Sequence, residues 1–315
     1  MKTKMVCRRN FLRTAAVGLG SAGMVRAFTR PPSADAIGTH ASANAQSEPA
    51  TQPAMAIQQV IDTILRQVPG EPLKETVDTV KAGDPSQAVK GIVTTFLATR
   101  NVVAQTVQLG ANFIITHEPT FYNHVDGVEW LTNDPVYLSK KNLIETHRLV
   151  VWRFHDHIHR LRPDGIMAGV LKELEWEPYA DRDAFDFCTV PAMSLSKTAG
   201  YFKKRLKIEK IQIVGDETMP CSRIAFAVGA AGRQTHVELL ERPDVDVLVV
   251  GEINEWETSE YVRDAVHQGM KKALIVLGHA KSEEAGMKHL AGWLRPLVPG
   301  VPITHVPAGS PFVFV

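Results

Sequence analysis

Cysteine is scarce in this chain, which holds only Cys7, Cys188 and Cys221. Outside the N-terminal segment two cysteines remain, and they could form one disulfide or stay as separate buried thiols. No stretch is apolar over the roughly 20 residues that a membrane-spanning helix needs. A phosphate-loop motif is also missing, because residues 229–232 (GAAG) are only a partial glycine-rich loop and are typical of a turn. These absences argue against a membrane-spanning segment and a phosphate-loop protein.

The N-terminus combines paired arginines with a weakly apolar segment. Residues 7–13 read CRRNFLR, and a Gly- and Ala-rich stretch of low charge covers residues 14–24. This layout is typical of a twin-arginine signal peptide, so we expect export to the periplasm or beyond by the twin-arginine pathway. Ala27 and Ala36 are the preferred processing positions. Proteins exported by this route are already folded, so a metal site could be loaded before transport.

Processing of the signal changes the charge of the chain. Residues 1–27 contain six basic residues and no acidic one, so their removal leaves 29 basic against 34 acidic residues, a net charge of −5. A mildly acidic protein of this kind argues against nucleic acid as a partner. The Ser-, Ala-, Pro- and Thr-rich residues up to about 53 predict a disordered linker. We therefore assign residues 1–54 to signal and linker, and the folded part to residues 55–315.

The folded part alternates Val- and Ile-rich runs with segments of helical period, which predicts an α/β protein with largely parallel sheets flanked by helices. Strands are predicted at residues 90–97, 111–116, 149–154, 211–214, 224–229, 245–250 and 273–278, with a last one at 311–315. Helices are predicted from an Asn101 cap to Gly110, from a Ser194 cap to Leu206, from near Glu257 to Gly269, and from a Ser282 cap to Leu294.

Two stretches share one plan. In each, a strand and a helix ending in glycine precede a second strand that finishes at a histidine, His117 in one and His279 in the other. The carboxyl ends of parallel strands are where ligands bind in open sheets. We therefore expect two similar lobes, residues 55–180 and 181–315, whose histidines meet in the cleft between them. The C-terminal strand is a candidate to return to the first lobe, and residues 187–242 form a βαββ-like segment.

The first polar cluster is His117 and Glu118, followed by Pro119. Adjacent side chains of a strand point to opposite faces, so two neighbours can converge only where the strand breaks. Pro119 supplies that break. The pair is a candidate for metal binding, with an exposed turn as the alternative.

The second cluster places three histidines within five positions. If the preceding strand continues, His155, His157 and His159 lie on one face and Asp156 and Ile158 on the other. Imidazoles at this spacing need partners when they are buried. The pattern favours metal binding or catalysis over packing.

The third cluster is His279 and Glu283. His279 is predicted to end a strand and Glu283 to lie in the first turn of the following helix, where the helix dipole favours the ionised carboxylate. Such a carboxylate could bind a metal, or it could simply satisfy the start of the helix.

With these clusters in place, the chain resembles the dinuclear metal-centre family of GTP cyclohydrolase 1 type 2 homologues, also called the NIF-three-like family. The resemblance covers nearly all of the folded part. It rests on residues 82–85 (AGDP), 110–119 (GANFIITHEP), 155–165, 245–252 (VDVLVVGE) and 278–283 (GHAKSE). It implies two similar α/β lobes, a toroidal homohexamer, and two metal ions held between the lobes by five side chains.

By this resemblance the five metal ligands are His117, Glu118, His159, His279 and Glu283. The family usually has a second histidine at the position of Glu118 and an aspartate at the position of His159. The two departures compensate, because three histidines and two acids are kept.

The third ligand could instead be Asp156 or His157. Leu97 is a further departure, since the family's first strand usually ends in an aspartate there.

Mixed imidazole and carboxylate ligands suit two divalent ions, Zn, Mn, Fe or Ni. Two such ions can share a water and lower its pKa, which predicts a hydrolase acting on a small-molecule substrate. Glu283 would bridge the ions, and Glu252 or Glu255 would move the proton. The alternatives are a non-catalytic, ring-forming metal-binding scaffold and a phosphoesterase or amidohydrolase for an extracellular substrate. GTP itself is scarce outside the cytoplasm.

Overall fold

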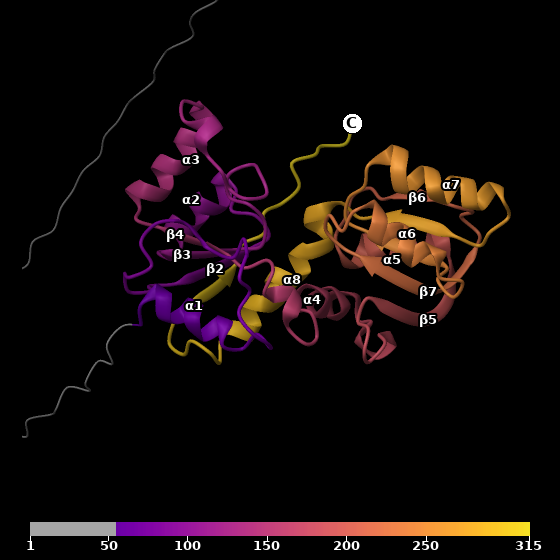
Figure 1. Cartoon of the computed structure of the whole chain (residues 1–315), viewed down its shortest axis with the longest axis horizontal. Coiled ribbons are helices and arrows are strands. Elements are labelled where there is room, and N and C mark those ends of the chain that lie inside the picture. The colour runs from indigo at the N-terminus through magenta and orange to yellow at the C-terminus, as the bar shows by residue number, and fades with distance from the viewer. Residues whose placement is uncertain (1–54) are drawn as a thin grey trace, which may run out of the picture. The chain divides into compact units, whose positions relative to one another are not determined.

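The computed structural model describes residues 55–315, so the predicted signal peptide and linker lie outside the described residues. Its strands form two five-stranded sheets, each covered by helices (Figure 1). Among the helices of residues 55–315, none is both long and apolar enough to cross a membrane.

The first sheet has the strand order β1-β4-β3-β2-β10. Its strands are β1 (Val80–Ala82), β2 (Ile92–Thr95), β3 (Phe113–Thr116), β4 (Val150–Arg153) and β10 (Ile303–His305). Only β1 is antiparallel to its neighbour. Every residue of β2, β3 and β4 is buried, which explains their continuous apolar runs. The helices and 3-10 turns of this half are α1 (Ile57–Leu65), α2 (Arg100–Gln108), η1 (Glu129–Leu131), α3 (Pro135–Thr146) and η2 (Ile158–Arg160).

The second sheet has the order β5-β7-β8-β9-β6. Its strands are β5 (Phe187–Ser194), β6 (Gln212–Val214), β7 (Pro220–Ala227), β8 (Val247–Val250) and β9 (Ala273–Val276). The three inner strands are parallel, and both edge strands are antiparallel. Its helical segments are η3 (Glu177–Tyr179), α5 (Leu195–Arg205), α6 (Arg233–Glu241), the π-helical turn η4 (Glu255–Ser259) and α7 (Glu260–His267). The prediction of two largely parallel sheets flanked by helices is confirmed.

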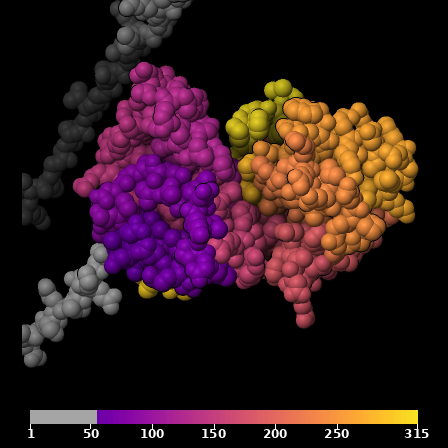
Figure 2. Space-filling model, viewed as in Figure 1, coloured from indigo at the N-terminus to yellow at the C-terminus, as the bar shows by residue number. Residues whose placement is uncertain are grey.

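Two helices, α4 (Gly165–Leu174) and α8 (His279–Leu294), lie between the sheets (Figure 1). One hydrophobic cluster runs from Phe113 of the first sheet through both helices to Val247 of the second. The helices approach closely at Gly169, where a Cβ atom would lie 2.3 Å from the carbonyl oxygen of Ala285. In the space-filling view, rose-coloured residues lie between the indigo-to-magenta residues and the orange residues (Figure 2).

The repeated strand-helix-strand plan is present in both halves. Strands β2 and β3 are parallel neighbours joined by α2, and β8 and β9 are parallel neighbours joined by η4 and α7. Gly110 and Gly269 follow the two helices with positive φ angles of 67° and 79°, as predicted for helix ends. Each unit therefore delivers a histidine just beyond the carboxyl end of its second strand.

Two predicted helix caps were wrong. Thr99, and not Asn101, caps α2, because its hydroxyl accepts the Val102 N–H at 3.1 Å. Helix α8 begins at His279, three residues before the predicted Ser282 cap. The Ser282 hydroxyl donates to the His279 carbonyl at 2.7 Å and accepts the Gly229 N–H at 2.9 Å, so it joins the helix to a loop instead of starting it.

The predicted cap of α5 is confirmed, since the Ser194 hydroxyl accepts the Lys197 N–H.

The predicted last strand at residues 311–315 was also wrong. The last strand is β10, which pairs in parallel with β2 of the first sheet. Pro307, Gly309 and Pro311 interrupt the segment after it, and proline cannot donate to a strand ladder. The side chains of Phe312 and Val313 are consequently 74% and 85% exposed.

The two described cysteines are separate thiols. Cys188 on β5 lies opposite Ile224, and Cys221 on β7 lies opposite Met193, so the strand register does not place the two sulfurs face to face. Burial raises the pKa of each thiol to about 12, which keeps both in the unreactive protonated form.

Candidate metal centre

His117 and Glu118 leave the carboxyl end of β3 in a turn that is held by backbone bonds. Both of their N–H groups donate to the Phe96 carbonyl, at 3.2 and 2.8 Å. The His117 ring is fully buried, and its Nδ1 atom lies 3.2 Å from the Phe154 carbonyl oxygen. A proton on Nδ1 satisfies that contact and leaves Nε2 as a lone-pair donor, the usual state of a metal-binding histidine.

Arg153, the last residue of β4, holds this turn through a hydrogen bond to its backbone. Its guanidinium is completely buried and donates to the carbonyls of His117 and His124, and it contacts Glu118 Oε2 at 3.4 Å. The other oxygen, Glu118 Oε1, is left to face His155 and His279, at 3.6 and 3.5 Å from their Nε2 atoms. Arg153 therefore balances the charge of Glu118 and fixes the direction of its free oxygen.

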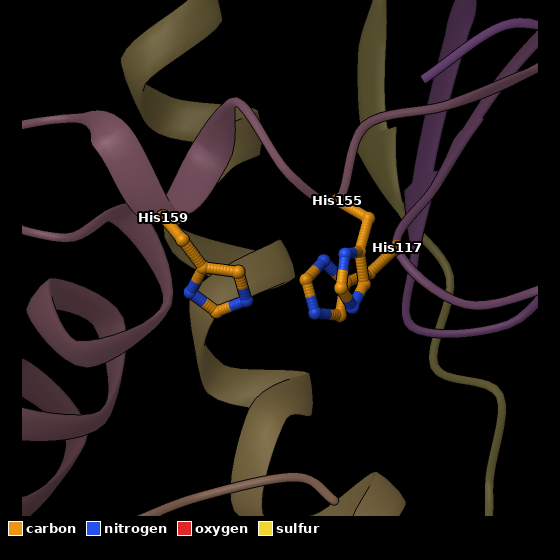
Figure 3. Close-up of side chains that lie close together, drawn as sticks. All are labelled: His117, His155 and His159. Atoms are coloured by element: carbon orange, nitrogen blue, oxygen red, sulfur yellow. The ribbon is translucent and has the colours of Figure 1, made fainter. Parts of the chain in front are cut away.

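Residues 155–159, here called the histidine loop, do not continue β4, so the condition under which its three histidines would share one face is not met. The strand ends at Arg153, and the loop turns so that only His155 and His159 face His117. His155 stacks on His117 with ring centroids 4.6 Å apart, and His159 presents an edge at 5.2 Å from His117 (Figure 3). His157 points elsewhere, with its Nδ1 atom 2.7 Å from Asp78.

Two carboxylates orient the rings of the histidine loop. His155 Nδ1 lies 2.9 Å from Asp156, and His159 Nδ1 lies 2.7 Å from Asp164, the N-cap of α4. Burial and the nearby His117 lower the pKa of His155. Burial would also lower the pKa of His159, but the bond to Asp164 raises it above its ordinary value. Both arrangements leave the Nε2 atoms free to bind a metal.

Helix α8 supplies the third part of the site. His279 is its first residue and Glu283 follows one turn later, so both lie on one face with Nε2 and Oε2 3.2 Å apart. Glu283 Oε2 also lies 3.5 Å from His117 Nε2. Phe96 packs edge-on against the His279 ring. Because the helix starts at His279, Glu283 lies in its second turn, which corrects the predicted first-turn position.

Gly229, which follows β7, gives the Glu283 carboxylate its room. Its φ angle is +67°, and a Cβ atom there would lie 2.2 Å from Glu283 Oε1. Gly251, after β8, is equally confined, since its Cβ would lie 2.3 Å from the Gly229 carbonyl oxygen. The second sheet therefore holds the carboxylate against the histidines of the first.

Two buried polar atoms of the site lack a hydrogen bond, and this bears on whether the site fits a metal. Within residues 55–315, His117 Nε2 and Glu283 Oε2 are both fully buried and have no hydrogen-bond partner. A buried polar atom without a partner is costly, and a bound cation would satisfy both atoms at once. Two groups could each hold a cation: His117 with His155 and His159, and His117 with Glu118 and Glu283. These residues fit a metal.

Opposite charges lie side by side in the cluster, with His279 between the carboxylates of Glu118 and Glu283. Burial alone would lower the pKa of His279, but the carboxylates of Glu118 and Glu283 raise it to about 10. Burial would likewise raise the pKa of both glutamates, but His279 and His117 hold each below its ordinary value. A metal bound through His279 would have to displace the proton of that ring.

The structure brings together all five residues predicted as ligands, at the distances given above. It adds His155, which belonged to the predicted histidine cluster but was not assigned as a ligand. The alternatives face other groups: Asp156 accepts hydrogen bonds from Thr76 and Val77, and His157 contacts Asp78. Asp78 itself was missed, because no sequence signal links it to residues almost 80 positions away.

The two predicted proton carriers differ in position. Glu252 Oε2 lies 3.2 Å from His279 Nδ1, and its side chain is more than half exposed. Glu255 begins η4 and is exposed; within the described residues, its carboxylate forms no ion pair with the histidines of the site. Only Glu252 therefore contacts the cluster.

These features define a class: a two-sheet α/β protein with a buried imidazole and carboxylate cluster at the carboxyl ends of parallel strands. The chain belongs to the Duf34/NIF3 (NGG1p interacting factor 3) family, whose sequence model matches residues 55–307.

Relatives agree with this assignment. A protein of Clostridium acetobutylicum named GTP cyclohydrolase 1 type 2 homolog is 24% identical over 245 residues, covering 72% of this chain and 88% of the relative. An Escherichia coli K12 protein of the same name is 24% identical over 219 residues, covering 66% of this chain and 81% of the relative.

Solved structures share the fold. A Staphylococcus aureus hypothetical protein superposes with a TM-score of 0.67 at 18% identity, covering 84% of this chain and all of that one. A Bacillus cereus protein related to NIF3 superposes with a TM-score of 0.66 at 14% identity, covering 84% of this chain and all of that one.

Proposed function

We propose that this protein is a hydrolase that uses two divalent metal ions to activate water against a small-molecule substrate. The observation that carries the proposal is the convergence of six ligand-type side chains, among which the buried His117 Nε2 and Glu283 Oε2 atoms have ion-pair contacts but no hydrogen bond. A site built only for packing would not leave a buried imidazole and a buried carboxylate facing each other without a hydrogen bond.

The donor set indicates which ions would fit. The site offers four imidazoles and two carboxylates: His117, His155, His159, His279, Glu118 and Glu283. Imidazole-rich sites suit Zn, Fe and Ni, and the carboxylates also admit Mn. When bound, such ions supply Lewis-acid activation of a water or a substrate oxygen.

Glu252 is the residue of the chain best placed to move a proton. Its carboxylate reaches the His279 ring from the solvent side, so it can exchange protons with bulk water. General acid-base catalysis needs a group within hydrogen-bond reach of the reacting atoms, and Glu252 is the exposed acid nearest the cluster. Replacing Glu252 by Gln should lower kcat by about 10²- to 10⁴-fold and leave the metal content unchanged.

Metal analysis of the purified protein followed by a substrate screen tests the proposal. The screen should include nucleotides, phosphodiesters and amides with added Mn²⁺ or Zn²⁺, and it should include GTP because the relatives carry the name GTP cyclohydrolase 1 type 2 homolog. Glu283→Gln should lose both metal and turnover. Retained metal and full turnover in that variant would overturn the mechanism, and bound metal with no turnover on any substrate would favour the scaffold alternative.

We also propose export and self-assembly. Export is supported by the sequence CRRNFLR at residues 7–13. Replacing Arg8 and Arg9 by Lys should retain the protein in the cytoplasm, as measured by cell fractionation. A homohexamer is the assembly that the family resemblance implies, and sedimentation of the purified protein tests it.

A further inference from the structure

The histidine loop is folded around a carboxylate that has no assigned role, Asp78, two residues before β1. The Asp78 side chain is completely buried, and its two oxygens accept four hydrogen bonds. Oδ1 accepts the N–H groups of His155 and Asp156, at 2.8 and 3.0 Å. Oδ2 accepts the N–H and the ring Nδ1–H of His157, at 2.9 and 2.7 Å. Within residues 55–315, every hydrogen bond to the Asp78 carboxylate therefore comes from the loop that presents His155 and His159.

The geometry of these bonds decides which histidines reach the site. In a continued strand, His155, His157 and His159 would share one face, and their successive N–H groups would point in alternate directions. Here three consecutive N–H groups converge on one carboxylate, which requires a tight turn. The turn directs His157 toward Asp78 and leaves His155 and His159 against His117.

We propose that Asp78 is a positioning residue that folds the histidine loop so that His155 and His159, and not His157, are presented to the metal. The inference rests on the proposed metal site and adds a residue that does not itself touch the metal. A second tie supports it: the Thr76 hydroxyl accepts the Asp78 N–H and donates to Asp156, so residues 76–78 clamp the loop at two points.

The role can be tested with Zn²⁺ alone and a matched control. Asp78→Asn keeps the shape of the side chain, but its amide nitrogen cannot accept a bond from the loop. Asp246→Asn makes the same change elsewhere, where the Asp246 carboxylate accepts the N–H groups of Ser222 and Arg223, both at 2.8 Å. We expect Asp78→Asn to weaken the Kd for Zn²⁺ by 10- to 100-fold, as losses of ligand-orienting groups do. Asp246→Asn should change it by less than about threefold, because its loop carries no candidate ligand.

His157→Asn provides a second variant that separates positioning from ligation. An asparagine can still donate to Asp78, so the loop should keep its turn and the Kd should stay within about threefold of the wild type. A 10- to 100-fold loss in this variant would mean that His157 is itself a ligand, and the inference would fail.

The outcomes distinguish the two proposals. If the wild-type protein does not bind Zn²⁺, the proposed function is overturned, together with the inference that rests on it. If the wild type binds Zn²⁺ and folded Asp78→Asn binds it equally well, only the positioning role is overturned. Thermal melts with and without Zn²⁺ show whether each variant is folded, and we expect the shift on adding Zn²⁺ to shrink in Asp78→Asn alone.

Discussion

Glu283 is the residue at which charge, burial and backbone conformation meet. Its carboxylate is almost completely buried, lies between the imidazoles of His117 and His279, and fits only because Gly229 has no side chain. A lone buried carboxylate would be costly, and here neighbouring imidazoles hold its pKa below the ordinary value. The position therefore depends on a partner residue of one sheet and a glycine of the other.

Gly229→Ala should damage the site through contact with Glu283. The new Cβ would lie 2.2 Å from Glu283 Oε1, so the carboxylate must move. We expect about tenfold or greater weakening of Zn²⁺ binding, measured by isothermal titration. Gly232→Ala is the matched control, since its φ angle is also positive at +85° and its Cβ would meet no described atom within 4 Å. Equal loss in both variants would show that backbone strain, and not the contact, is responsible.

Lys140 on α3, which is not one of the candidate ligands, should make the stability of the fold depend on pH. Its side chain is buried and donates to the Thr120 carbonyl; burial lowers its pKa to about 8, although Asp126 opposes that shift. The unfolded chain, with an ordinary lysine pKa of about 10.4, binds more protons between these two values, so this lysine's contribution to stability rises with pH across that window.

The comparison of wild type with Lys140→Met isolates this effect. From pH 7 to pH 10.5, the free energy of unfolding of the wild type should rise relative to that of Lys140→Met by on the order of 3 kcal/mol. Urea denaturation at the two pH values measures it. A difference that does not change with pH would contradict the shifted pKa of Lys140.

Among the helices, α8 both carries two candidate ligands, His279 and Glu283, and packs between the two sheets. Its start at His279 places His279 and Glu283 one turn apart on the face toward the site, and its later residues Met287 and Leu290 pack in the shared core. Gly169 of α4 allows the two helices to approach within backbone contact. The position of the ligands therefore depends on how closely α4 and α8 pack.

Gly169→Ala should separate the two helices. We expect a loss of about 1–3 kcal/mol in the free energy of unfolding, because the added methyl group would overlap the Ala285 carbonyl. Gly200→Ala on α5 is the control, since its Cβ would meet no described atom within 4 Å. That substitution should stabilise the protein by about 0.5–1 kcal/mol through helix propensity. Urea denaturation of both variants checks the prediction, and a neutral Gly169→Ala would contradict the close packing.

At the scale of the whole described molecule, the site links segments far apart in the chain. His117 and Glu283 are 166 positions apart in sequence and lie 3.5 Å apart in the structure. A cation bound there would stabilise only the folded arrangement, since the unfolded chain does not hold these ligands together.

Removal of metal should therefore lower the melting temperature. At a free Zn²⁺ concentration of 100 times Kd, the expected stabilisation is about 2.7 kcal/mol, which chelation should abolish. Calorimetry with and without a chelator measures the shift. Glu283→Gln should show little shift, and an equal shift in that variant would place the stabilising metal elsewhere.

The α/β class, most inner strands and the positions of the ligand-type residues could be predicted from the amino-acid sequence alone. These are local properties: apolar runs mark buried strands, and glycines end helices. His117 and His279 each follow a strand of a different parallel sheet, and ligands bind at the carboxyl ends of such strands. Local signals were less reliable at boundaries, where the Thr99 and Ser282 hydroxyls and the prolines after β10 decided the outcome.

Which side chains of the histidine loop face the site depends on contacts between distant segments and could not be predicted from the sequence. The direction of His155, His157 and His159 is set by Asp78, a residue from another segment. In the same way, Gly229 and Arg153 shape the surroundings of Glu283 and Glu118 from separate strands. Such contacts depend on the packing of distant segments, and the periodicity of a single segment carries no record of them.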